Sequence, residues 1–194
     1  MYWVERVPYH IKKIYNMSNI QTIKTNIRLL APRPFGEKIG EIVLDNLIPN
    51  LSKADNNSHD RKQGKKKVES KFARAITKIN TKNISFIQQL SSTASFSYVK
   101  SKSKEKFDCN IQQVKPKCFD ILYYGVIFDD YVYIFKISSE QLLNDSKNIG
   151  YSNKQHRGNV GEGQFHIKTT NLEYHIDNYL FSKLSWTEFI KLLK

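Results

Sequence analysis

The sequence has no hydrophobic run long enough to cross a membrane, and it has very few cysteines. A membrane-spanning helix needs about 20 consecutive apolar residues, and no stretch of the chain approaches that length. Cys109 and Cys118 are its two cysteines, too few for a disulfide scaffold and without the paired spacing of a zinc site. The N-terminus also lacks the apolar segment of a secretory signal. We therefore expect a cytoplasmic protein with reduced thiols and no membrane partner.

Acidic residues are scarce relative to basic ones. The chain has 31 Lys and Arg but 18 Asp and Glu, which gives a formal net charge of +13 at pH 7. A surplus of this size favours a polyanion as partner, because neutralised phosphates release condensed counterions. Lys, Asn and Ile are abundant throughout, so the coding bias of an AT-rich genome is an alternative cause. The charge favours nucleic-acid binding over this alternative.

The length and composition favour a single globular domain over residues 1–194. A chain of 194 residues can bury one sizeable core, whereas two full domains would be cramped. Residues 1–30 form a polar N-terminal arm, in which Met17 is an alternative start. Patterned segments concentrate in residues 36–137, and a polar, amide-rich region follows at 150–170.

Local patterns predict the main helices and strands. Apolar residues recur every three or four positions from Gly36 to Leu47, which indicates an amphipathic helix. Runs rich in Ile, Val, Tyr and Phe at 119–128 and 131–137 indicate a hairpin of buried strands, with Asp129-Asp130 as its turn. The remaining expectations are a loop at 50–64, a strand at 65–73, a helical or mixed segment at 74–90, a long connection at 91–117, a strand at 164–168, and helices after the capping boxes that begin at Ser138 and Ser185.

Asp60 and the triplet Glu69-Ser70-Lys71 form the pattern of a metal-dependent site. Side chains alternate along a strand, so Glu69 and Lys71 share a face. A tight reversal at Gly64 would bring Asp60 against Glu69. Two carboxylates with open water positions suit Mg²⁺, which can lower the pKa of a bound water. Lys71 could then orient or deprotonate that water and stabilise charge on a phosphate.

A solvated charge cluster is the alternative explanation of this triplet. The chain contains three acid-x-Lys triplets, about the number that chance produces in a lysine-rich sequence. A rival pairing of Asp120 with Lys136 lacks a second carboxylate, and we expect Asp120 to be a structural group. The upstream acid, the turn and the preceding helix favour Asp60 with Glu69.

The helix with a glutamate, the loop to an aspartate, the turn and Val68-Glu69-Ser70-Lys71 together resemble the core of PD-(D/E)XK nucleases, in particular small type II restriction endonucleases. The resemblance covers about residues 36–137, and His59 stands where the family motif has proline. It implies Asp60 and Glu69 as Mg²⁺ ligands, Lys71 as the catalytic lysine, and Glu41 as a helix glutamate that supports the metal site. Glu41 belongs to an acidic row with Glu37 and Asp45, which we expect to be ordinary solvent-exposed residues.

The same resemblance implies the fold and the partners. It implies an α/β fold with a mixed central β-sheet flanked by helices, and a homodimer that cuts double-stranded DNA at a short sequence and leaves 5′-phosphate ends. A cognate DNA methyltransferase would protect host DNA as a functional partner. A repair or junction-resolving nuclease on the same core and a non-catalytic DNA-binding domain are the two alternatives.

A polar segment after the core predicts the residues that contact DNA. Arg pairs with guanine edges and Asn or Gln with adenine edges, which favours base recognition here, although a plain surface loop would have a similar composition. His156, His166 and His175 could suggest a metal site, but their spacing matches no standard zinc pattern. Arg74 and Lys78, just after the triplet, are placed for phosphate contacts. The predicted contacts in the polar segment are Asn153, Lys154, Gln155, His156, Arg157 and Gln164.

Overall fold

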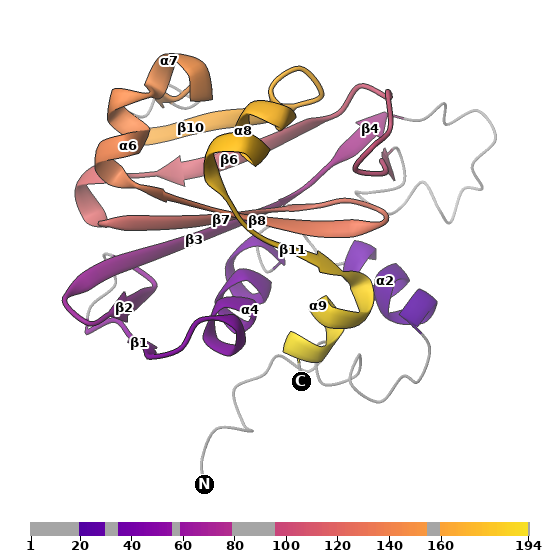
Figure 1. Ribbon diagram of the computed structural model, residues 1–194, viewed down its shortest axis with the longest axis horizontal. Coiled ribbons are helices and arrows are strands. Elements are labelled where there is room, and N and C mark those ends of the chain that lie inside the picture. The colour runs from indigo at the N-terminus through magenta and orange to yellow at the C-terminus, as the bar shows by residue number, and fades with distance from the viewer. Residues whose placement is uncertain (1–19, 30–34, 56–58, 79–95, 155–159, 194) are drawn as a thin grey trace, which may run out of the picture.

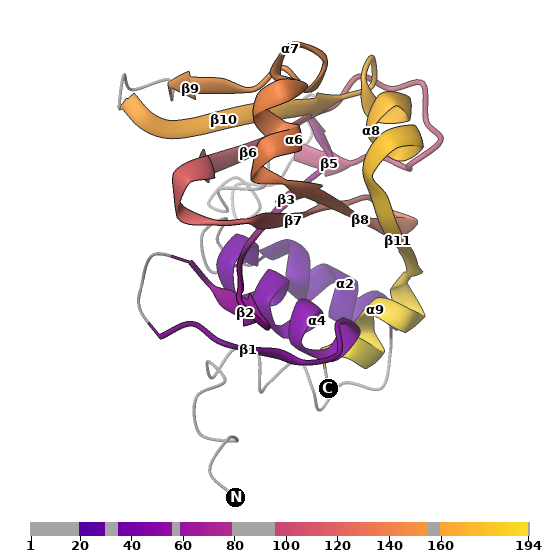
Figure 2. The same cartoon turned by 60° about the vertical axis from the view of Figure 1, so that its left-hand side comes forward.

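Two stacked β-sheets with helices on the outside form a mixed α/β fold (Figures 1 and 2). The computed structural model describes residues 20–29, 35–55, 59–78, 96–154 and 160–193. Within these ranges no helix is long and apolar enough to cross a membrane.

The first sheet is the mixed central sheet that the sequence predicts. Its parallel pair, β3 with β7, places Val68 opposite Ile121, and every other neighbouring pair is antiparallel. In spatial order its strands are β1 (Leu51–Lys53), β2 (Arg61–Gln63), β3 (Lys66–Arg74), β7 (Ile121–Ile127), β8 (Tyr131–Ser138) and β11 (Leu180–Ser185).

The second sheet is antiparallel throughout and was not predicted. The chain enters it directly after β3, because Ala75 separates β3 from β4. In spatial order its strands are β5 (Phe96–Tyr98), β4 (Ile76–Lys78), β6 (Asp108–Val114), β10 (Val160–Lys168) and β9 (Ser152–Lys154).

Helices cover the outer face of the first sheet, and further helices lie beside the two sheets. Helix α2 (Ile20–Leu29), the π-helical turn η2 (Phe35–Ile39), α4 (Gly40–Leu47) and α9 (Trp186–Leu192) lie on the first sheet (Figure 2). The 3₁₀ turn η4 (Pro116–Cys118), α6 (Ser139–Asn144), α7 (Ser146–Ile149) and α8 (Leu172–Tyr179) complete the fold. Both predicted capping boxes are confirmed: the Ser138 hydroxyl accepts from the Gln141 amide at 3.0 Å, and Ser185 and Glu188 repeat the arrangement.

The alternation of β3 and β7 divides the interior into two cores. Val68 and Phe72 face the helices, and Leu122 and Tyr124 face the second sheet. Phe72 occupies a notch between α4 and β7, because Gly40 and Gly125 have no side chains there.

The patterned segments were predicted well and the polar ones less well. The helix over 36–47, the strand over 65–73, the strand over 164–168 and the hairpin of β7 and β8 are confirmed. The segment at 50–64, predicted as a loop, contains the short strands β1 and β2. The prediction of a long connection at 91–117 was wrong, because this segment contains β5 and β6. The segment at 74–90 contributes β4, and its residues after 78 lie outside the described ranges, as does the arm up to residue 19.

Candidate active site

The hairpin of β2 and β3 joins Asp60 to the triplet. Gln63 pairs with Lys66 around a two-residue turn, in which Gly64 has the positive φ of +61° that favours glycine. At the other end of β2, the Asp60 amide donates to the Val68 carbonyl at 3.1 Å. The predicted reversal at Gly64 is therefore confirmed.

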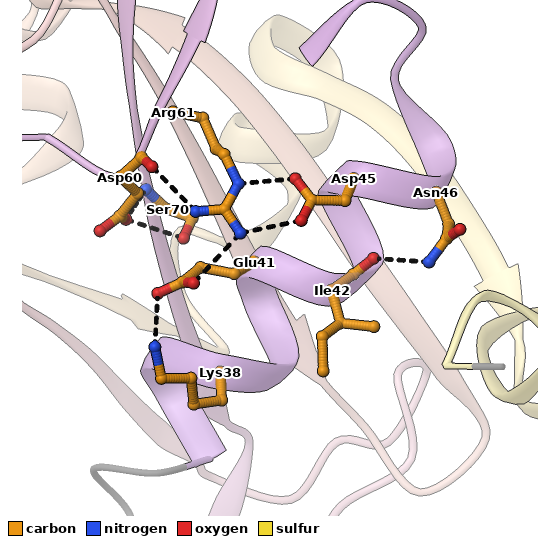
Figure 3. Close-up of polar contacts among 8 residues, drawn as sticks. All are labelled: Lys38, Glu41, Ile42, Asp45, Asn46, Asp60, Arg61 and Ser70. Atoms are coloured by element: carbon orange, nitrogen blue, oxygen red, sulfur yellow. Dashed lines mark hydrogen bonds and ion pairs between the residues drawn. The ribbon is translucent and has the colours of Figure 1, made fainter. Parts of the chain in front are cut away.

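The Asp60 carboxylate is held in place by Ser70, the middle residue of the triplet. Asp60 Oδ2 accepts hydrogen bonds from the Ser70 amide at 2.8 Å and from its hydroxyl at 2.9 Å (Figure 3). Within the described chain no donor reaches Asp60 Oδ1. One oxygen of this carboxylate is thus fixed, and the other is available to a ligand.

Val68 and Phe72 lie on one face of β3, and Glu69 and Lys71 project from the other face. Ala73, two residues further on this face, packs against the second core, so the pair points toward the second sheet. Lys71 Nζ forms an ion pair with Glu69 Oε1, and the two side chains are 18% and 13% exposed. The triplet is therefore a half-buried ion pair and not a fully solvated cluster.

The environment of Glu69 is unfavourable for a negative charge. Burial raises its pKa above the usual range, and the charge of Asp60 adds to the rise, whereas Lys71 and Lys115 oppose it. Asp60 and Glu69 thus repel each other electrostatically. A divalent cation between two such carboxylates would remove this repulsion.

Asp60 and Glu69 offer carboxylate oxygens, the ligand type that a hard cation such as Mg²⁺ prefers. Asp60 Oδ1 and Glu69 Oε2 accept no hydrogen bond from the residues that the structure describes. Mg²⁺ keeps several waters and is commonly bound by one or two carboxylates. Across the described ranges no group of three or more His, Cys, Asp and Glu side chains could hold a metal ion. The protein would contribute two ligands, as the resemblance implies.

Glu41 does not join these carboxylates. Its carboxylate contacts Arg61 Nη2 at 3.1 Å and Lys38 Nζ at 3.5 Å (Figure 3). Asp45 is exposed, as we expected, and it also accepts two hydrogen bonds from Arg61, at 2.6 and 2.8 Å. Glu41 and Asp45 on α4 therefore both bind Arg61, a residue that sequence reasoning missed. The available signal was its place next to Asp60. The side chain of Glu37, on η2, is not described.

Lys115 and Glu162 are two further residues that the sequence did not single out. Lys115 follows β6, and its Nζ lies 2.7 Å from Glu162 Oε1 on β10. Gln113, with a φ of +56°, marks an irregularity shortly before Lys115. Lys115 also affects the pKa of Glu69. A second lysine thus lies within electrostatic range of the Asp60–Glu69 pair.

The residues predicted to contact DNA differ in their exposure. Asn153 and Lys154 are exposed on β9, whereas Gln155, His156 and Arg157 lie outside the described residues. Gln164 is 8% exposed in the middle of β10, between β6 and β9, and accepts a hydrogen bond from Asn110 at 3.2 Å. This burial contradicts a role for Gln164 as an exposed base contact.

Arg74 and Lys78 lie at strand ends, and Asp120 and His175 have structural hydrogen bonds. Arg74 ends β3 and is partly buried; Lys78 ends β4, and its side chain is not described. Asp120 accepts a hydrogen bond from the Lys67 amide at 2.7 Å, which supports its structural role between β3 and β7. His175 is fully buried against Tyr124.

Comparison of the sequence with models of protein families gives no match, and comparisons with curated proteins and with solved structures give none either.

Proposed function

We propose that the protein is a Mg²⁺-dependent endonuclease of the type II restriction class, which hydrolyses phosphodiester bonds in double-stranded DNA at a short specific sequence. The observation that supports this most is the bond of Asp60 to Ser70 across the β2–β3 hairpin, beside the Glu69–Lys71 ion pair. Asp60 and the Glu69–Lys71 pair thereby lie in one hairpin of the mixed central sheet, and the charge of Asp60 acts on the pKa of Glu69.

Each residue of this site would have a separate task. Asp60 and Glu69 would hold Mg²⁺, which when bound supplies positive charge to the scissile phosphate and lowers the pKa of a water. Lys71 would orient the attacking water and stabilise negative charge on the phosphate oxygens. Ser70 keeps Asp60 in position through its amide and hydroxyl.

The charge distribution supports DNA as the substrate. Lys65, Lys66 and Lys67 are exposed at the hairpin turn that leads to Glu69. With a net charge of +13, the chain can neutralise several phosphates of a duplex. Asn153 and Lys154 remain our proposed contacts to DNA within the described chain, and we retain Arg157 and its neighbours as the proposed base contacts.

A homodimer would match the proposed substrate. A duplex site with two-fold symmetry is cut on both strands by two copies of one active site. Sedimentation velocity is expected to give twice the monomer mass of 22.7 kDa, whereas a monomer at all concentrations would count against a symmetric cut. A cognate methyltransferase completes the proposed system.

The experiment that tests this function is a comparison of Glu69→Gln with Glu140→Gln. Both substitutions remove one carboxylate, but the exposed Glu140 on α6 makes no hydrogen bond or ion pair with Asp60, Glu69 or Lys71 in the described chain. Glu69→Gln is expected to lower the rate of Mg²⁺-dependent plasmid cleavage by at least about 100-fold, because the site loses a metal ligand. It should leave DNA binding unchanged, and Glu140→Gln should cleave like the wild type.

Three other results would each have a different meaning. Equal cleavage by both variants would contradict the site assignment. Cleavage at random sites, or a preference for branched DNA, would support the repair alternative. Salt-sensitive DNA retention without any cleavage would support the non-catalytic alternative.

A further inference from the structure

We propose that Arg61 is a positioning residue that fixes Asp60 relative to α4, and that Glu41 and Asp45 act on the site through Arg61. This inference rests on the proposed function, because it assigns a role in organising the same site. It also gives Glu41 a different role from that of a direct support for the metal.

All three guanidinium nitrogens of Arg61 donate hydrogen bonds. Nε and Nη2 donate to the two oxygens of Asp45 at 2.6 and 2.8 Å, and Nη2 also donates to Glu41 at 3.1 Å. Nη1 donates to the backbone carbonyl of Asp60 at 2.8 Å (Figure 3). Only the planar, fork-shaped guanidinium can make this set of bonds, because an ammonium is a point charge.

Because Arg61 is nearly buried, its charge depends on these bonds for stabilisation. Its side chain is 11% exposed, and a nearly buried cation is held only where anions and hydrogen bonds compensate for lost hydration. Two carboxylates of α4 supply that compensation. Removal of the guanidinium would therefore leave Asp45 without its hydrogen-bond donors, and Glu41 with the Lys38 contact at 3.5 Å.

Asp60 has three anchors, and Arg61 is the one that connects it to a helix. Its amide bonds to Val68 and its carboxylate to Ser70, which are both on β3. Its carbonyl bonds to Arg61, whose other partners are on α4. Because α4 packs on β3 through the notch at Phe72, the Arg61 bonds tie the end of β2 to a rigid support. A misplacement of about 1 Å in such a residue can cost about 100-fold in rate.

The test compares Arg61→Lys and Arg61→Gln with Lys62→Gln. Lys62 is the next residue of β2, and its ion pair is with the exposed Asp55, so the control loses the same charge from the same strand. We expect Arg61→Gln to lower kcat by about 30- to 100-fold with a change in KM for DNA below about threefold. Arg61→Lys should recover only part of kcat, and Lys62→Gln should match the wild type.

A second readout does not depend on cleavage. Mg²⁺ that binds the folded state alone stabilises it against urea, so the Mg²⁺ concentration that gives half of this stabilisation reports the metal affinity. We expect that concentration to rise at least about fivefold in Arg61→Gln and to stay unchanged in Lys62→Gln. Where Arg61→Gln fails to fold, Asp45→Asn provides the milder variant, with the same direction expected in both readouts.

A double-mutant cycle separates the two roles of Glu41. If Glu41 acts through Arg61, Glu41→Gln adds little to the loss that Arg61→Gln already causes. Fully additive losses would instead mean that Glu41 acts on the metal directly, and would overturn that part of the inference. Wild-type kcat and Mg²⁺ response in Arg61→Gln, beside an inactive Glu69→Gln, would overturn the inference but not the proposed function. A wild-type protein that does not cleave DNA would overturn both.

Discussion

At the scale of single residues, His175 shows how burial controls a titration. Its side chain is fully buried on α8, and its Nδ1 lies 2.9 Å from the Tyr124 hydroxyl. The ring stacks on Phe165 with centroids 6.1 Å apart. Burial lowers the pKa of His175 to about 4, and the negative charge of Asp145 opposes this shift.

The folded protein should therefore lose stability as the pH falls toward 4. The folded pKa of His175 is lower than the ordinary value of about 6.5 in the unfolded chain, so the unfolded state binds the proton first. The contribution of His175 to the free energy of unfolding is fully present above about pH 6.5. As the pH falls to about 4, up to about 3 kcal/mol of this contribution is lost. Urea denaturation across this range measures the slope.

His175→Gln distinguishes this cause from general acid sensitivity. The variant should have a lower free energy of unfolding at pH 7, and that free energy should change less with pH than in the wild type, because the group whose pKa is lowered by burial is absent. An unchanged slope in His175→Gln would contradict the assignment.

At the scale of elements, Phe72 sets how closely α4 approaches the first sheet. A Cβ at Gly125 would lie 2.3 Å from two atoms of the Phe72 ring, and a Cβ at Gly40 would lie 2.6 Å from the ring on its other side. Both glycines are therefore needed for close packing. The positions of Glu41 and Asp45, and through them Arg61, depend on this contact.

Gly125→Ala is expected to lower the free energy of unfolding by about 1–3 kcal/mol, because the added methyl group overfills the notch. In a Phe72→Leu background the same substitution should cost less, since the smaller side chain leaves space. Urea denaturation of the four proteins gives both values. Costs that are equal in the two backgrounds would show that Phe72 does not cause the strain.

The helix at 36–47, the β7–β8 hairpin and both capped helices could be predicted because their signals are local. Strand β6 was missed because its buried residues, such as Cys109 and Ile111, alternate within a segment whose surroundings are rich in Ser and Lys. Asp60 and Glu69 could be predicted from a turn between them. Arg61 could not, because its partners on α4 are 16 and 20 residues away and meet it only after the helix packs on the sheet.

At the scale of the whole molecule, the charge of +13 should determine how DNA binding responds to salt. A protein that contacts about six phosphates has a slope of about −5 in a plot of log affinity against log salt concentration. Filter binding of a short duplex without Mg²⁺ measures this slope, and Glu69→Gln should share it. A slope near zero would mean that the positive charge is not used for DNA.

Digestion of a sequenced plasmid by the purified wild-type protein, with Mg²⁺ and with EDTA, tests the central claim most directly. We predict discrete fragments with Mg²⁺ and none with EDTA, with 5′-phosphate ends that map to one short sequence. Intact plasmid under both conditions, at protein concentrations that saturate DNA binding, would contradict the proposal that Asp60, Glu69 and Lys71 form a nuclease site.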